Sequence, residues 1–183
     1  NMRIISGKAK GTKLYTLEGL ETRPTLDRVK ESLFNIIQNR IADSIFLDLF
    51  AGSGAIGLEA VSRGAAKAIL CDNSEKAIQI IKKNISKTHA EDKVEIYKMQ
   101  YDRLLESLKE KVDIIYIDPP YNSKLASEAI KIILEGDILK PETIMIIETD
   151  QKGRILEELS EVNVEVIDER KYGRAQLIFL RKG

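Results

Sequence analysis

The sequence predicts an α/β fold with a mostly parallel, seven-stranded sheet. Three observations lead to this prediction. Short apolar runs alternate with helical patterns from about residue 45 onward, a glycine-rich loop follows the first of these runs, and two strand-like runs close the chain. Such alternation is typical of successive βαβ units. The chain has 183 residues, of which 43% are hydrophobic, so we expect a single domain over residues 1–183.

Two elements precede this alternation. The stretch RIISGKAKGTKLYT predicts a small basic β-hairpin around Gly7 to Gly11, which makes residues 1–24 an N-terminal extension of a body at 25–183. A helix is predicted in RPTLDRVKESLFNII, because Thr25 can cap it and Asp27 lies in its first turn. Its apolar residues also share one face: Val29, Leu33, Ile36 and Ile37.

The main body is expected to alternate five strands with five helices. The predicted strands cover 45–50, 68–72, 94–98, 112–118 and 143–149. The predicted helices lie near 55–63, 74–88, 101–110, 124–135 and 152–160. The final period-two runs, 162–170 and 175–181, are joined only by KYGR, which is too short for a crossover helix. They predict a hairpin, which forces one antiparallel strand at the sheet edge.

Composition excludes several classes of protein. One cysteine, Cys71, supplies no disulfide framework, and one histidine, His89, leaves no Cys/His cluster of metal-ligand spacing. Cys71 is interpreted as a small apolar residue of a buried strand and His89 as a surface residue at a helix end. The first residues lack the apolar core of a signal peptide, and no apolar run approaches a membrane span. We expect a cytoplasmic monomer without a metal.

Charge is unevenly distributed although the formal net charge is zero. Residues 1–40 carry eight basic and four acidic side chains, and residues 170–183 carry five basic and none acidic. Basic ends on an acidic body suit the binding of a polyanion such as RNA. The alternative is that these charges are only solvated. The candidate RNA-binding residues are Arg3, Lys8, Lys10, Lys13, Lys171 and Arg174.

The sequence GSGAIG, residues 52–57, matches the GxGxxG loop of dinucleotide-binding proteins. Asp48, near the end of the preceding strand, argues against such a ligand, since its charge would repel a pyrophosphate. A ligand with an ammonium and a sulfonium group would be attracted instead. S-adenosylmethionine (AdoMet) is such a ligand.

Further candidate contacts follow the next two strands. Asp72 can accept hydrogen bonds from ribose hydroxyls, with Asn73 beside it, although Asp72 can also cap the helix that begins near Ser74. Gln100 and Tyr101 occupy the place expected for an adenine. Asp102, next to them, is alternatively a helix cap.

The tetrapeptide DPPY, residues 118–121, ends the fourth predicted strand at the same sheet edge as the glycine loop. Two prolines fix the turn and remove two N–H donors. Asp118 and the Pro119 carbonyl can then accept hydrogen bonds from a planar exocyclic amine, and Tyr121 can stack on its base. The alternative is that DPPY is only a strand-ending turn.

Taken together, these segments resemble the AdoMet-dependent amino-methyltransferases, whose signature is [DNS]PP[YFW]. RIISGKAKGTKL, RPTLDRVKESLFNII, LDLFAGSGAIGLEAVSRGA and IDPPY occur in the order seen in the RsmD-like family, which methylates guanine N2 in bacterial small-subunit (16S) ribosomal RNA. The resemblance implies a Rossmann-like class I methyltransferase fold, with rRNA or the assembling small subunit as partner. It implies AdoMet contacts at Asp48, Ala51, Gly52, Gly54 and Asp72, catalysis at Asp118, Pro119, Pro120 and Tyr121, and closure by Arg23 to Thr25.

Two alternatives to this function remain at this point. A DNA adenine-N6 methyltransferase shares the tetrapeptide, and a noncatalytic RNA-binding protein could share the fold. Arg23 also has two interpretations, since its guanidinium can pair with the AdoMet carboxylate or a substrate phosphate, or be a surface charge.

Overall fold

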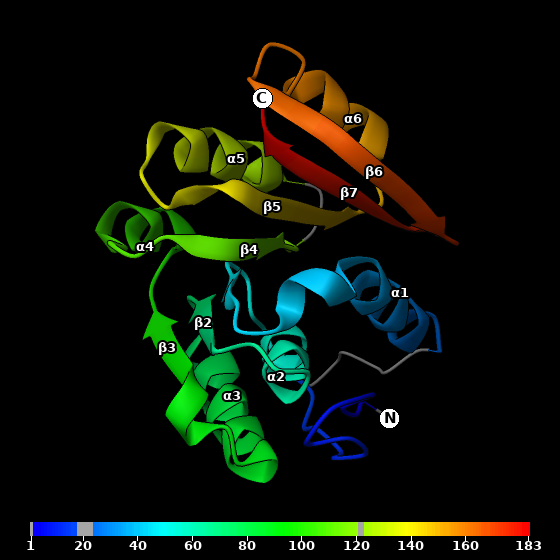
Figure 1. Ribbon diagram of the computed structural model, residues 1–183, viewed down its shortest axis with the longest axis vertical. Helices are drawn as coiled ribbons and strands as arrows, with labels where there is room; N and C mark the ends of the chain where they lie inside the picture. The colour runs from blue at the N-terminus through cyan, green and yellow to red at the C-terminus, as the bar shows by residue number, and fades with distance from the viewer. Residues whose placement is uncertain (1, 18–23, 121–122) are drawn as a thin grey trace.

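Seven strands form one sheet in the order β3-β2-β1-β4-β5-β7-β6, in a computed structural model that describes residues 2–17, 24–120 and 123–183 (Figure 1). Strands β3, β2, β1, β4 and β5 run parallel, and β7 runs antiparallel to both β5 and β6. The predicted mostly parallel sheet is confirmed. The strands are β1 Ile45–Asp48, β2 Lys67–Asp72, β3 Val94–Lys98, β4 Val112–Ile117, β5 Leu139–Thr149, β6 Val164–Tyr172 and β7 Ala175–Lys182.

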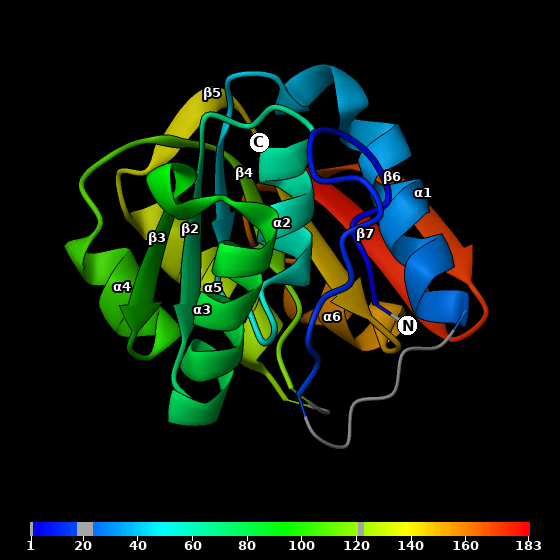
Figure 2. The ribbon, with the colours of Figure 1, turned by 90° about the horizontal axis from the view of Figure 1, so that it is seen from below.

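Helices cover both faces of the sheet (Figures 1 and 2). One layer holds α4, α5 and α6, whose apolar residues pack on odd-numbered positions of the central strands, such as Leu47 and Ile115. The other layer holds α1, α2 and α3, and α1 packs on even-numbered positions such as Phe46 and Ile114. The helices are α1 Pro24–Ile41, α2 Ala55–Ser62, α3 Glu75–Thr88, α4 Tyr101–Ser107, α5 Leu125–Glu135 and α6 Lys152–Glu158, with a 3₁₀ turn at Glu91–Lys93.

The N-terminal segment pairs as a short hairpin. Arg3 and Lys13 form an antiparallel bridge, the Ile4 N–H donates to the Thr12 carbonyl at 2.9 Å, and the Leu14 N–H donates to the Met2 carbonyl at 2.8 Å. The segment also bonds to α2: the Lys8 N–H donates to the Ser62 carbonyl at 2.8 Å. Helix α1 begins at Pro24, so Thr25 lies inside the helix and not before it. The fixed φ of proline suits the first helical position.

The C-terminal hairpin is confirmed, but its antiparallel strand is not at the edge. Strand β7 inserts between β5 and β6, and β6 forms the edge of the sheet. Burial explains this order, because β7 is apolar and buried from Leu177 to Leu180, whereas β6 is largely polar and exposed. In the described part of the chain, no helix is both long and apolar enough to cross a membrane.

Candidate active site

The glycine loop joins β1 to α2 at the carboxyl edge of the sheet. Gly52 and Gly54 have φ values of +57° and +82°, a left-handed conformation that side chains disfavour. The N–H of Ala51 donates to the Cys71 carbonyl at 2.8 Å, and that of Gly52 donates to Asp72 Oδ2 at 2.9 Å. The loop is therefore tied to the end of β2, which brings two predicted cofactor contacts, Gly52 and Asp72, into direct contact.

The third glycine of the motif serves packing. A Cβ at Gly57 would lie 2.3 Å from Leu70 Cδ2, so α2 can approach β2 this closely only with glycine there. This close approach fixes the start of α2 at the sheet edge.

Asp72 is not the N-cap of α3. The cap of α3 is Ser74, whose hydroxyl accepts from the Ala77 N–H at 3.2 Å. Asp72 Oδ1 accepts from the Ser74 N–H at 2.9 Å. Because a carboxylate offers about four acceptor positions, Asp72 keeps capacity for further hydrogen bonds, and Asn73 beside it is exposed.

Three carboxylates gather where β1, β4 and β5 end. Register pairs Asp48 with Tyr116 and Ile117 with Ile147, so Asp118 and Glu148 follow as neighbours. Asp48 is 1% exposed and accepts the Phe50 N–H at 3.1 Å. Burial, followed by the charges of Asp72 and Glu148, raises the pKa of Asp48 to about 7. A cationic ligand here would offset the cost of ionising this group.

Glu148 belongs to this group although the sequence analysis did not identify it. The Tyr116 hydroxyl donates to Glu148 Oε1 at 2.5 Å, and burial raises the pKa of the Glu148 carboxyl. Burial raises the pKa of Asp118 as well, and the neighbouring charges of Glu148 and Asp48 raise it further. The Asp118 side chain is nevertheless exposed at the pocket, so the charges of Glu148 and Asp48 are the better-founded cause of its raised pKa. One feature of the sequence does point to this residue, because Glu148 ends the apolar run of the fifth predicted strand.

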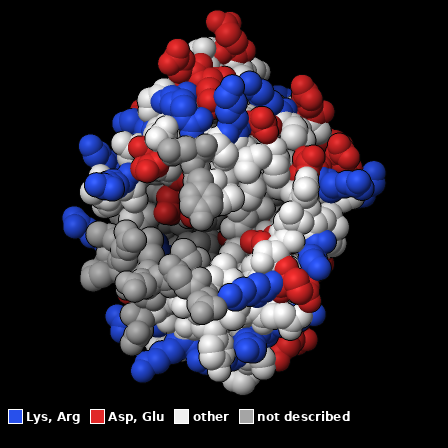
Figure 3. Space-filling view, turned by 180° about the vertical axis from the view of Figure 1, so that it is seen from behind, with Lys and Arg blue, Asp and Glu red and all other residues white. Residues whose placement is uncertain are grey.

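A pocket of about 590 Å³ opens beside these carboxylates. Figure 3 shows acidic groups within a hollow on this side of the molecule, with basic groups around it. The pocket is lined by the end of β4, the start of α5, the end of β5, α6 and the β6–β7 turn. Its polar side chains are Asp118, Ser123, Glu148, Thr149, Asp150, Arg154 and Arg174. The pocket thus contains Arg174, a predicted RNA contact, together with Asp118 and Pro119 of the tetrapeptide.

The predicted adenine contacts lie at the start of α4. The ring of Tyr101 lies 5.2 Å from that of Phe50, which follows β1, and Gln100 is exposed immediately before the helix. Asp102 is not the helix cap, because Gln100 occupies that position. Asp102 Oδ1 is buried and has no hydrogen-bond partner among the described residues. An orphaned acceptor here fits a ligand that carries an amine, as an adenine does.

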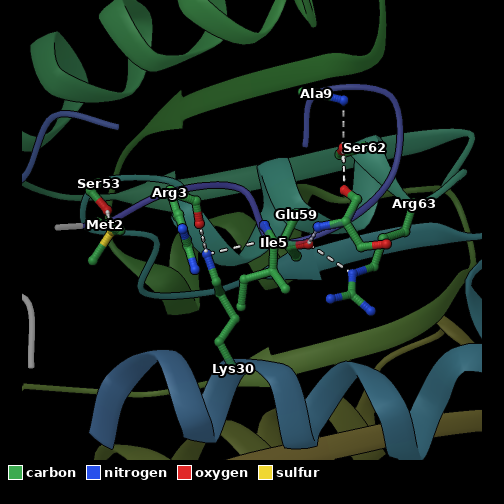
Figure 4. Close-up of polar contacts among 10 residues, drawn as sticks. Met2, Arg3, Ile5, Ala9, Lys30, Ser53, Glu59, Ser62 and Arg63 are labelled. Carbon is green, nitrogen blue, oxygen red and sulfur yellow. Dashed lines mark hydrogen bonds and ion pairs between the residues drawn. The ribbon is translucent and has the colours of Figure 1, made fainter. Parts of the chain in front are cut away.

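A buried ion-pair network fastens the N-terminal segment to the body (Figure 4). Glu59 of α2 is fully buried and accepts hydrogen bonds from the N–H groups of Ile5 and Ser6, at 2.9 and 3.1 Å. Lys30 Nζ and Arg63 Nε lie 3.2 and 2.8 Å from its two oxygens. Figure 2 shows this segment running beside α2 towards the carboxyl edge of the sheet.

The basic residues of the N-terminal segment remain on the surface. The side chains of Arg3, Lys8, Lys10 and Lys13 are exposed, as are those of Lys171 and Arg174. Only Arg174 among these lines the pocket beside Asp118.

Several predicted positions cannot be placed. Arg23 and Tyr121 lie outside the described residues, and only the backbone of Thr25 is described. The two residues set aside by the sequence analysis behave as expected. His89 is exposed at the end of α3, and burial raises the pKa of Cys71 to about 12, which makes it a poor nucleophile.

Comparison with known families supports the methyltransferase interpretation of this fold. A family model described as Conserved hypothetical protein 95 matches residues 2–181. The chain belongs to this family. Relatives named as ribosomal RNA small subunit methyltransferase D identify it with the RsmD-like family that the sequence motifs resemble, and they make the family one of methyltransferases.

Two such relatives illustrate the similarity. The Haemophilus influenzae protein is 37% identical over 153 residues, which are 82% of this chain and 79% of the relative. The Escherichia coli K12 protein is 35% identical over 149 residues, which are 81% of this chain and 75% of the relative.

Solved structures agree with the family assignment. The candidate methyltransferase yhhF of Escherichia coli has a TM-score of 0.82 at 27% identity and covers 99% of this chain and 97% of its own. The candidate methylase HI0767 of Haemophilus influenzae has a TM-score of 0.78 at 28% identity and covers 99% and 98%. The predicted class I methyltransferase fold is confirmed.

Proposed function

We propose that the protein transfers a methyl group from AdoMet to the exocyclic N2 amine of a guanine in small-subunit (16S) ribosomal RNA. The observation that carries this proposal is the group of Asp48, Asp118 and Glu148 beside the glycine loop. This group favours a cationic methyl donor over an anionic dinucleotide. The names of the relatives support ribosomal RNA as the substrate.

The residues around the glycine loop fit AdoMet. Asp48, Ala51, Gly52 and Gly54 would hold its methionine part, Asp72 and Asn73 its ribose, and Gln100 and Tyr101 its adenine, with Arg23 and Thr25 closing over it. The buried Asp102 Oδ1 offers an additional acceptor for the adenine amine. When bound, AdoMet supplies an electrophilic methyl group on a sulfonium, so the base nitrogen gains the methyl, the sulfur keeps the bonding pair and the nitrogen must then lose a proton.

The DPPY turn positions the target amine. Asp118 follows the last paired residue of β4, and Pro119 and Pro120 have no N–H groups that could compete for its carboxylate. Hydrogen bonds from the amine to Asp118 and to the Pro119 carbonyl would orient the nitrogen lone pair, while Tyr121 stacks on the base. The raised pKa of Asp118 suits this carboxylate to receive the proton that the methylated nitrogen releases.

A transfer assay with radiolabelled AdoMet tests the proposal. The substrates are small-subunit particles, 16S rRNA transcribed in vitro without modifications, and duplex DNA, and digestion identifies the labelled nucleoside. We expect N2-methylguanosine from an rRNA-containing substrate and no label in DNA. N6-methyladenine in DNA would replace the proposal with the DNA methyltransferase alternative. RNA binding without transfer to any substrate would favour the noncatalytic alternative.

A further inference from the structure

Glu148 is a pocket carboxylate that, in the proposed function, only adds negative charge near the methyl donor. It shares the 590 Å³ pocket with Asp118 and Arg174, and this volume lies in the range of small-ligand sites, roughly 300–1,000 Å³. The pocket therefore has room for a flipped-out nucleotide, with an exposed cation at the β6–β7 turn where a phosphate could bind.

The sheet register places Glu148 beside Asp118. The last pair between β4 and β5 is Ile117 with Ile147, so Asp118, the residue after β4 ends, follows beside Glu148 of β5. Neighbouring strands lie about 4.8 Å apart, and paired residues of parallel strands project from the same face. Two carboxylates thus stand side by side at the pocket.

One oxygen of Glu148 is already engaged. The hydroxyl of the buried Tyr116 donates to Oε1 at 2.5 Å, which fixes the orientation of the carboxyl group. Oε2 has no hydrogen-bond partner among the residues that the structure describes. Burial raises the pKa of Glu148, and the Tyr116 hydrogen bond opposes that effect by favouring the ionised form. The second oxygen is an oriented acceptor without a donor.

Three RNA bases carry an exocyclic amine, and they differ at the neighbouring ring nitrogen. In guanine, N1 carries a hydrogen and donates alongside the N2 amine. In adenine and cytosine, the ring nitrogen beside the amine is an acceptor, which a carboxylate repels. Two adjacent carboxylates are therefore complementary to guanine alone among these bases.

We propose that Glu148 selects guanine as the target base by accepting a hydrogen bond from its N1–H, beside Asp118, which holds the N2 amine. This inference rests on the proposed function and adds a specificity-determining residue to it. The site recognises the donor–donor edge of the base and not merely the presence of an amine.

The test compares guanine with 2-aminopurine at the mapped target position of an RNA substrate made by ligation. The analogue keeps the 2-amine but lacks N1–H. With 2-aminopurine bound, Glu148 would lack a hydrogen-bond donor. We therefore expect the wild-type protein to prefer guanine over 2-aminopurine in kcat/KM by about 10- to 100-fold. Glu148→Ala should lower kcat/KM for guanine by a similar factor and leave that for 2-aminopurine nearly unchanged, so the preference disappears.

Glu142→Ala provides a matched control, because Glu142 is an exposed glutamate on the same strand, β5. It should keep the wild-type preference. Circular dichroism and urea unfolding show whether Glu148→Ala is folded.

Outcomes separate the two proposals. If guanine N2 is methylated but Glu148→Ala lowers kcat/KM for both substrates by the same factor, Glu148 has only a structural role and this inference fails alone. If Glu148→Ala does not fold, Tyr116→Phe takes its place. This substitution removes the hydrogen bond to Oε1 that orients Glu148, so the preference for guanine should weaken. An unchanged preference overturns the inference. If the wild-type protein methylates another base, both proposals fail.

Discussion

The side-chain amide of Asn84 forms two hydrogen bonds with the main chain of Tyr15: Oδ1 accepts the N–H at 2.7 Å, and Nδ2 donates to the carbonyl at 2.9 Å. Nδ2 also donates to the carbonyl of Ser53, in the glycine loop, at 2.9 Å. Asn84 is fully buried in α3. A single side chain therefore connects the N-terminal segment, the glycine loop and α3.

Asn84→Ala should destabilise the protein by about 2–4 kcal/mol, since it leaves the bonded groups of Tyr15 and Ser53 without partners. AdoMet affinity should fall as well, because the glycine loop loses one of its supports. Urea unfolding and calorimetric titration measure the two effects. Asn163→Ala, at an exposed site with one hydrogen bond, is the control and should change stability little. Equal stability of the two variants would contradict the proposed connection.

Asp48→Asn should change how stability depends on pH. The pKa of Asp48 is raised from 3.8 to about 7, so the folded protein holds this proton more tightly than the unfolded chain. The free energy of unfolding consequently falls as pH rises from about 4 to about 7, by up to ~4 kcal/mol from this group. Asparagine keeps an oxygen acceptor for Phe50 but does not ionise.

We therefore expect the stability of Asp48→Asn, relative to wild type, to increase between pH 4 and pH 8. Urea unfolding across this range, without AdoMet, provides the comparison. Parallel pH profiles for the two proteins would show that burial of Asp48 has no such cost.

Gly57→Ala tests the close packing of α2 on β2. A Cβ there would lie 2.3 Å from Leu70 Cδ2, so Leu70 must move, and we expect a net loss of about 1–2 kcal/mol despite the better helix propensity of alanine. Gly153→Ala in α6 meets nothing within 4 Å and should stabilise the protein by up to about 1 kcal/mol. The prediction is wrong if thermal unfolding shows both variants equally stabilised.

Charge reversal at Lys8, Lys10 and Lys13 tests the role of the N-terminal segment. These side chains are exposed, and the backbone of the segment is bonded to α2 at Lys8 and to Glu59 at Ile5 and Ser6, so the variant should fold normally. RNA binding should weaken, and the slope of log K against log salt should become shallower by up to about 2–3. AdoMet affinity should be unaffected. Reversal of the exposed Lys109 and Lys131 is the control, and an equal change of slope in both variants would assign no specific role to the segment.

The strands and the carboxylates at their ends are the features that the sequence predicts well, because both follow from strand periodicity. Asp48, Asp72 and Asp118 each end or directly follow a short apolar run, so the parallel-sheet rule collects them at one edge. Glu148 ends such a run too, but only the pairing of Ile117 with Ile147 shows that it neighbours Asp118.

Other contacts could not be predicted from local patterns. Glu59 and Asn84 lie within helical segments, and their partners are backbone groups 54 and 69 residues away. No spacing rule links a helical side chain to a distant main chain. The same contacts hold the short N-terminal hairpin, which is bridged at Arg3 and Lys13, against the body.

The most direct test of the central claim, that Asp118 positions the target amine for methyl transfer, is the single-turnover rate of Asp118→Ala at saturating RNA and AdoMet. The variant should still bind AdoMet, with a modest loss of affinity, because the glycine loop and the carboxylates of Asp48 and Glu148 remain. Removing one of three neighbouring carboxylates should not destabilise the fold. We predict that the rate of methyl transfer falls by about 10²–10³, the usual effect of losing one preorganised group. Retention of more than about a tenth of the wild-type rate would contradict the account.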